Sequence, residues 1–295
     1  MTETTRVLTA DGTSVGVHHL PADESGEPDG PLVVGLHGFT TSGAAMLPLL
    51  ERIRDGRPAL AIDLVGHGVS DAPEHLEPYQ MSSVDDQVLS VIGPRPPGSV
   101  HLVGYSMGGR VCMSLAARAP WYFASLVTVS STPGIEDPVE RAARQERDGA
   151  LADHIESVGT EAFIEEWLAN DMFAPYVDSL DPTRRNETLQ LRSSASATGL
   201  ANSLRGTGTG AMPPVWNTLP SIQSPILAVA GALDSRFVDL ALAVQEKAPS
   251  ARAEIVDRAG HVVHEENPDR VTYLVAVFCN AVTVNETGEP ETIQL

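Results

Sequence analysis

Lysine is nearly absent from this chain: Lys247 is its single lysine, against 18 arginines in 295 residues. Acidic residues outnumber basic ones by 39 to 19, which gives a formal net charge of -20 at pH 7. A surface of that sign repels phosphate groups. Nucleic acids and anionic membranes are therefore not expected as partners.

Cysteine is scarce as well, since the chain contains only Cys112 and Cys279. Both lie in apolar stretches with a helical pattern, which indicates buried thiols rather than a disulfide. No zinc-type spacing of cysteine and histidine occurs, so no metal site is predicted. The polar start, Met1 to Thr5, and the lack of any apolar run of membrane-spanning length indicate a soluble, cytoplasmic protein. We expect it to be a monomer or weak homo-oligomer.

Short apolar segments alternate with helical patterns through the first half of the chain. The predicted strands are 32–36, 59–62, 100–103 and 126–129, and helices are expected over 44–53, over 84–92 and after residue 106. A hairpin over 6–20, turned at Asp11-Gly12, and a loop over 21–31 come first. Such alternation requires parallel pairing with right-handed crossovers, so we expect an α/β fold with a mostly parallel sheet flanked by helices.

A glycine-serine motif follows the predicted strand 100–103: Gly104-Tyr105-Ser106-Met107-Gly108. A G-x-S-x-G pattern between a strand and a helix is the nucleophile elbow of the α/β-hydrolases. The turn is so tight that a side chain two residues before or after the serine would clash, which explains the glycines. The Ser106 hydroxyl is then held above the sheet, and the Met107 amide faces a developing oxyanion.

The partners of this serine should follow in the order acid, then histidine. Asp234 follows a predicted strand over 225–230, and His261 follows another over 253–256. We expect Asp234 to fix the tautomer of His261, and His261 to take the proton of Ser106. His264 is the competing base, although its glutamate neighbours also fit a solvated residue at a helix start.

A second oxyanion donor is expected in the loop after strand 32–36. There the Phe39 amide is the natural donor, while the preceding His37 more plausibly orders the loop than takes part in chemistry. His67, in a glycine-rich loop, has the same loop-shaping interpretation.

The strand pattern disappears between Pro133 and Pro214, where the sequence is polar and helical. Helical patterns cover 138–155, 161–168, 182–194 and 198–205. We interpret 134–210 as a helical cap over the serine, inserted into a core made of 1–133 and 211–284. Residues 285–295 are charged and are expected to fray.

Three arginines narrow the substrate class. Arg110 lies one helical turn after Ser106, and Arg144 and Arg192 lie in the predicted cap helices. Guanidinium groups bind carboxylates in a bidentate manner, so three of them converging on one cleft would indicate a small anionic substrate. Arg144 also has carboxylates at helical spacing, and pairing with those is the commoner arrangement.

At these residues the chain resembles the 2-succinyl-6-hydroxy-2,4-cyclohexadiene-1-carboxylate synthases, α/β-hydrolase-fold lyases of menaquinone biosynthesis. The resemblance runs from Val34 to about Val277. Its more diagnostic features are Arg110 after the double glycine, the start of the cap and the arginines of the cap. The matching segments are Leu36-His37-Gly38-Phe39, Gly104 to Arg110, Pro133-Gly134-Ile135, Arg144, Trp167, Phe173, Arg192, Asp234-Ser235-Arg236-Phe237 and Ala259-Gly260-His261.

The resemblance implies proton abstraction rather than acyl transfer. Ser106, activated by His261 and Asp234, would remove the proton alpha to the succinyl ketone, and pyruvate would be eliminated. The amides of Phe39 and Met107 would hold the enolate oxygen. The substrate would be bound by Tyr105, Arg110, Arg144, Trp167, Phe173 and Arg192, of which the two cap aromatics fit a packing role equally well. No metal or organic cofactor is implied.

Two other functions fit the same residues. A carboxylesterase or C–C bond hydrolase of this fold would use Ser106 as an acyl-forming nucleophile. A non-catalytic ligand-binding member of the fold is disfavoured, because it has little need of a complete serine, histidine and acid set.

Overall fold

The computed structural model describes residues 2–23, 30–284 and 290–292. Its main sheet has eight strands in the order β1-β2-β4-β3-β5-β6-β7-β8. Only β1 and β2 pair antiparallel with their neighbours, so the sheet is mostly parallel, as predicted. The strands are β1 (Glu3–Leu8), β2 (Ser14–Leu20), β3 (Leu32–Leu36), β4 (Ala59–Ile62), β5 (Val100–Tyr105), β6 (Ser125–Val129), β7 (Ile226–Gly231) and β8 (Ala251–Val256).

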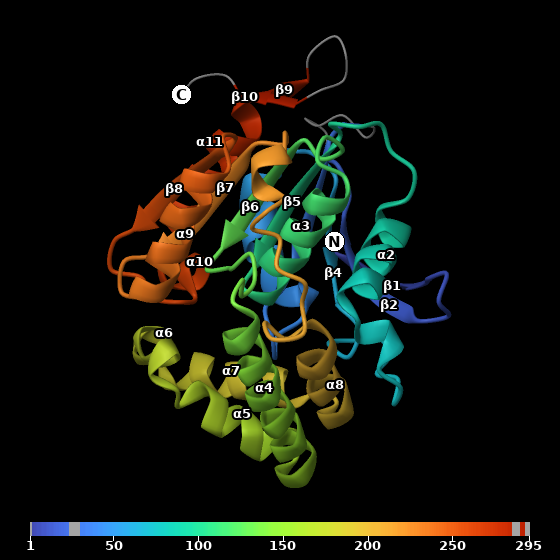
Figure 1. Cartoon of the computed structure of the whole chain (residues 1–295), viewed down its shortest axis with the longest axis vertical. Coiled ribbons are helices and arrows are strands. Elements are labelled where there is room, and N and C mark those ends of the chain that lie inside the picture. Colours follow the sequence, from blue (N-terminus) through green and yellow to red (C-terminus); the bar gives the residue numbers. More distant parts are fainter. Residues whose placement is uncertain (1, 24–29, 285–289, 293–295) are drawn as a thin grey trace.

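Helices cover both faces of this sheet (Figure 1). Leu50 of α1 (Leu47–Ile53) and Val275 of α11 (Pro268–Ala281) belong to one hydrophobic cluster. On the other face, α2 (Met81–Ile92), α3 (Met107–Arg118) and α9 (Ser235–Lys247) contribute to a second cluster. Every residue of β3, β5, β6 and β7 is buried, because these central strands are covered on both faces.

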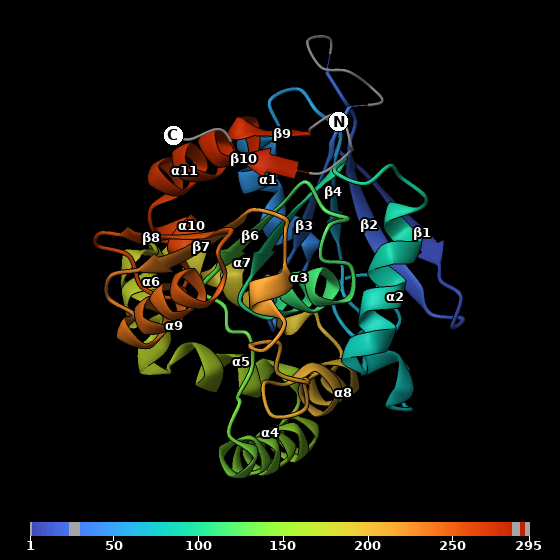
Figure 2. The ribbon, with the colours of Figure 1, turned by 45° about the horizontal axis from the view of Figure 1, so that its top comes forward.

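Between β6 and β7 the chain leaves the sheet for a group of helices. These are α4 (Pro138–Val158), α5 (Thr160–Leu168), α6 (Ala174–Ser179), α7 (Pro182–Ser193) and α8 (Ala197–Thr207). They lie together below the sheet in Figure 1, and Figure 2 shows the same layer from another direction. We call them the cap helices; that 134–210 forms a separate domain stays a prediction.

Shorter helical segments occur between these elements. Besides α10 (Val263–Glu266), they are the 3₁₀ turns η1 (Gly43–Met46), η2 (Glu77–Tyr79), η3 (Asp171–Phe173) and η4 (Leu219–Ser221). The sequence pattern missed α6, which is a short helix containing Pro175.

Near the C-terminus, Pro290–Thr292 form strand β10, which pairs antiparallel with β9 (Val282–Val284). That 285–295 fray stays a prediction, of which 285–289 and 293–295 lie outside the described residues. Both cysteines are buried free thiols, as predicted.

No helix of the described residues is long and apolar enough to cross a membrane. Among the same residues, no group of three or more histidine, cysteine or carboxylate side chains is arranged to hold a metal ion.

Candidate active site

Ser106 sits in a tight turn between β5 and α3. Its φ of 49° lies in the left-handed region, which a residue other than glycine adopts at a cost in strain. A Cβ on Gly104 would stand 2.4 Å from the Gly108 carbonyl oxygen, and one on Gly108 would stand 2.1 Å from the Leu36 carbonyl oxygen. Neither position has room for a side chain, as the elbow motif predicts.

The structure brings the predicted catalytic side chains together. His261 Nε2 lies 3.2 Å from Ser106 Oγ, and His261 Nδ1 lies 2.8 Å from Asp234 Oδ2. Asp234 follows β7 and His261 follows β8, so neighbouring parallel strands deliver both groups to the same edge of the sheet. With the Nδ1 proton donated to Asp234, Nε2 is free to accept the serine proton.

Two backbone amides are available beside this serine. Phe39 and Met107 line the same cavity as Ser106. Within the described residues neither amide donates a hydrogen bond to the protein. Unpaired amides in a buried turn are suited to bind an oxyanion.

The cavity above Ser106 has a volume of about 400 Å³ and lies between the core and the cap helices. That size suits a small organic molecule. Its lining contains the predicted Phe39, Ser106, Met107, Arg110, Arg144, Trp167, Asp234 and His261, together with Ser131, Thr132, Asn170, Met172, Ser203, Leu204, Gly208, Thr209, Arg236 and Phe237.

Arg110 and Arg144 supply positive charge to this cavity from two sides. Arg110 Nη2 donates to the Thr207 carbonyl at 3.0 Å, and its Nε is buried without a partner among the described residues. Arg144 Nε donates to Asp148 Oδ1 at 2.7 Å. Burial, then the charge of Arg144, lowers the pKa of Arg110 to about 10, so Arg110 stays charged at neutral pH. The single carboxylate of Asp148 thus faces the guanidinium groups of Arg110 and Arg144, so a positive charge remains to bind an anion.

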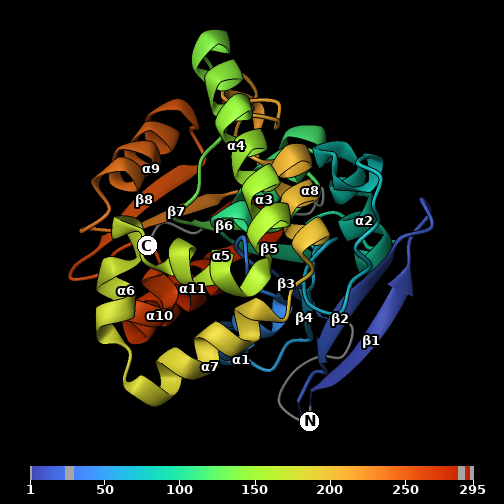
Figure 3. The same ribbon diagram turned by 90° about the horizontal axis from the view of Figure 1, so that it is seen from below.

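Arg192 does not join them. It lines a separate cavity of about 520 Å³ between α7 and the α1 and α10 region, which shares no lining residue with the Ser106 cavity. Figure 3 shows α7 beside α1 on that side of the molecule. Two of the three predicted arginines, Arg110 and Arg144, therefore line the Ser106 cavity, and a contact of Arg192 with substrate stays a prediction.

The three predicted aromatic contacts also divide. Trp167 lines the Ser106 cavity, and its Nε1 is buried without a partner among the described residues. Tyr105 and Phe173 are not part of that lining; instead their rings pack against His261 at 5.6 and 5.9 Å between centroids. Both rings therefore restrict the histidine ring, and their contact with substrate stays a prediction.

The three other histidines considered in the sequence have structural surroundings. His264 is buried rather than solvated: its ring packs on Tyr105, and burial lowers its pKa. His37 Nε2 accepts from the Leu64 amide at 3.0 Å, and Nδ1 donates to the Gly38 carbonyl at 2.8 Å. Burial lowers the pKa of His67 to about 3, so it remains neutral. These contacts fit the expected loop-ordering roles of His37 and His67.

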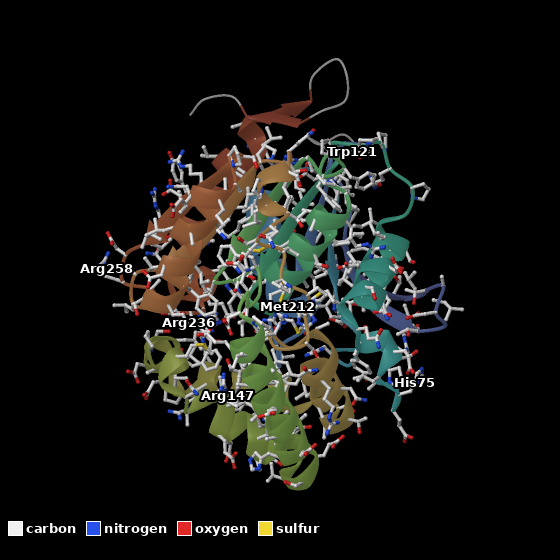
Figure 4. The ribbon with its side chains drawn as sticks, in the orientation of Figure 1. His75, Trp121, Arg147, Met212, Arg236 and Arg258 are labelled. Atoms are coloured by element: carbon white, nitrogen blue, oxygen red, sulfur yellow. The ribbon has the colours of Figure 1, made fainter. Side chains whose placement is uncertain are left out.

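Sequence reasoning assigned no role to Arg236, which lines the Ser106 cavity from the first turn of α9. Figure 4 labels it where the core meets the cap helices. The sequence did contain a signal for this position. Arg236 comes only two residues after Asp234, so it must lie at the same end of the sheet as the catalytic acid.

Known proteins match nearly the whole chain. The family model described as alpha/beta hydrolase fold matches residues 31–268. A protein of Bacillus subtilis (strain 168), provisionally named 2-succinyl-6-hydroxy-2,4-cyclohexadiene-1-carboxylate synthase, is 37% identical over 91% of this chain and 97% of its own length. The enzyme of that name from Salmonella paratyphi C (strain RKS4594) is 30% identical over 85% of this chain and 92% of its own length.

One solved structure agrees with this similarity. MenH from S. aureus superposes with a TM-score of 0.79 at 28% identity, covering 88% of this chain and 96% of its own. The chain thus belongs to the alpha/beta hydrolase fold family and, within it, to the 2-succinyl-6-hydroxy-2,4-cyclohexadiene-1-carboxylate synthases.

Proposed function

We propose that this enzyme is a lyase of menaquinone biosynthesis. It eliminates pyruvate from 2-succinyl-5-enolpyruvyl-6-hydroxy-3-cyclohexene-1-carboxylate and forms 2-succinyl-6-hydroxy-2,4-cyclohexadiene-1-carboxylate. Family membership supports the reaction. The observation that carries it in this chain is the hydrogen-bonded row of Ser106, His261 and Asp234 in a cavity that is also lined by three arginines, Arg110, Arg144 and Arg236.

The first step is removal of the proton alpha to the succinyl ketone. His261 Nε2 accepts the Ser106 proton, and the serine oxygen takes the substrate proton. Asp234 stabilises the imidazolium that forms. The enolate oxygen binds the amides of Phe39 and Met107, where one donor of this kind contributes about 3 kcal/mol to the transition state.

The second step breaks the C–O bond to the enolpyruvyl group. Electrons of the enolate move through the ring and leave with that group, which takes up a proton and becomes pyruvate. No oxidant or reductant is needed, because the elimination changes no net oxidation state. Arg110 and Arg144 bind substrate carboxylates, and the Trp167 indole N–H donates to an acceptor of the substrate.

A coupled assay tests this proposal directly. Purified full-length chain is mixed with the enolpyruvyl substrate, and released pyruvate is followed with lactate dehydrogenase and NADH. A panel of p-nitrophenyl esters is run beside it. Pyruvate release that disappears in Ser106→Ala supports the lyase. Ester turnover with an acyl-enzyme burst and no pyruvate release would replace it with the carboxylesterase alternative.

Several finer points belong to the same proposal. The enzyme acts on a small anionic substrate in the cytoplasm, as a monomer or weak homo-oligomer. Its surplus of acidic side chains supports a soluble setting away from anionic surfaces. Light scattering of the purified chain at micromolar concentration measures the oligomeric state.

A further inference from the structure

The Arg192 side chain crosses from the cap to the core. Its Nη1 donates a 2.7 Å hydrogen bond to Oγ1 of Thr40, which lies in the loop after β3. The two residues are only 3% and 1% exposed. Within the described residues no carboxylate forms an ion pair with this guanidinium. A buried cation is therefore directed at a neutral hydroxyl, which needs an explanation other than charge pairing.

Thr40 itself has an unusual backbone. Its φ of 68° lies in the left-handed region, which β-branched residues rarely adopt. It directly follows Phe39, whose amide is the proposed oxyanion donor. Within the same turn, Thr41 Oγ1 donates to the Gly38 carbonyl at 2.8 Å. A strained residue beside a functional amide persists only when surrounding contacts hold it in place.

We propose that Arg192 is a positioning residue for the oxyanion site. Its hydrogen bond to Thr40 holds the strained turn and keeps the Phe39 amide directed at the enolate oxygen. The inference rests on the proposed function for the identity of that oxygen. Because Arg192 belongs to α7 and Thr40 to the core, the oxyanion site is complete only when α7 is seated against the core.

This role differs measurably from binding a substrate carboxylate. A carboxylate contact is made in both ground state and transition state, so its loss raises KM. A misdirected oxyanion donor lowers kcat instead. It also slows any reaction at Ser106 that develops an oxyanion, including reaction with a probe that carries no carboxylate.

The neutral probe is phenylmethylsulfonyl fluoride. Ser106 Oγ bonds to sulfur, the S–F bond breaks, fluoride leaves, and His261 takes the serine proton. The rate of this labelling is measured by intact-protein mass spectrometry, and kcat and KM are measured for pyruvate release. The variants are Arg192→Met, Thr40→Val and their combination. Thr40→Ser keeps the hydroxyl, and Arg184→Met changes an exposed arginine of the same helix as a control.

We expect Arg192→Met and Thr40→Val each to lower kcat and the labelling rate by about 10- to 100-fold with little change in KM. The double variant should lose no more than either single one, because both remove the same hydrogen bond. Thr40→Ser should retain most of the rate, and Arg184→Met all of it.

Three results would overturn the proposal. One is an Arg192→Met variant with raised KM and unchanged kcat and labelling. Another is a silent Thr40→Val, and the third is a loss in Arg184→Met equal to that in Arg192→Met. A wild-type chain that is labelled at Ser106 but releases no pyruvate would refute the proposed function alone, since the labelling rates still test the Arg192 contact.

Discussion

Replacing Trp167 with phenylalanine tests whether the Ser106 cavity binds a hydrogen-bond acceptor. The Trp167 Nε1 atom is buried and has no partner among the described residues. Its ring packs against Phe39 and Phe173 at 5.5 and 5.7 Å between centroids. A phenyl ring preserves much of that packing and removes only the donor.

The expected change in free energy differs between the free and the substrate-bound enzyme. In the free enzyme an unpaired buried donor costs about 1–3 kcal/mol, and removing it offsets the packing lost with the smaller ring. The free energy of unfolding should therefore change by no more than about 1 kcal/mol. With substrate bound, a hydrogen bond to a charged acceptor contributes about 1.5–3 kcal/mol, so KM should rise about 10- to 150-fold.

Trp216 provides the matched control, because its Nε1 already donates to the Gly134 carbonyl at 2.8 Å. Trp216→Phe leaves that buried carbonyl unpaired and should lower stability by about 1–3 kcal/mol without changing KM. Urea unfolding and the coupled pyruvate assay measure both quantities. If Trp167→Phe behaved like Trp216→Phe, destabilised with an unchanged KM, the indole would be a structural group and the reasoning would be wrong.

Further predictions concern the site and the fold. Ser106→Ala should remove kcat in the pyruvate assay, and Asp234→Asn should lower it by about 10⁴-fold, because the amide favours the wrong tautomer of the histidine. Arg110→Met should raise KM strongly in the same assay. Arg118→Met, at the other end of the same helix, should leave KM unchanged. Burial raises the pKa of Asp85 to about 6 from 3.8, so the folded chain holds this proton more tightly than the unfolded chain. Its stabilising contribution is complete below pH 4 and is lost as pH rises through 6. Urea titrations should therefore show wild type losing up to about 3 kcal/mol relative to Asp85→Asn over that range.

The parts of the fold that sequence predicted well are those with a strong local signal. Strand 32–36 was predicted with its observed bounds, because an unbroken apolar run is typical of a strand covered on both faces. Strand β8 begins at Ala251, two residues before its predicted start. Its charged Arg252 obscured the signal, since an edge strand tolerates polar side chains.

The site shows a similar division. Ser106, Asp234 and His261 were predictable because each follows a strand at the same edge of the sheet. The direction of Arg192 was not, since it depends on where α7 lies relative to the loop after β3, whose Thr40 accepts its hydrogen bond. The burial of His264 could not be predicted either, because it depends on a tertiary contact. Its ring packs against Tyr105, which is far from it in the sequence.

The cap helices leave the sheet after β6 and return to β7, and these two strands are hydrogen-bonded neighbours. The chain thus re-enters the sheet beside the strand it departed from, and the strand order is independent of what lies in between. The cap helices can therefore be replaced during evolution, which changes the shape of the ligand cavity. The catalytic serine, histidine and aspartate stay unchanged, because the sheet positions them. The cap side of the cavity can therefore vary while the sheet stays the same, whereas Arg110 contributes to substrate binding from the core.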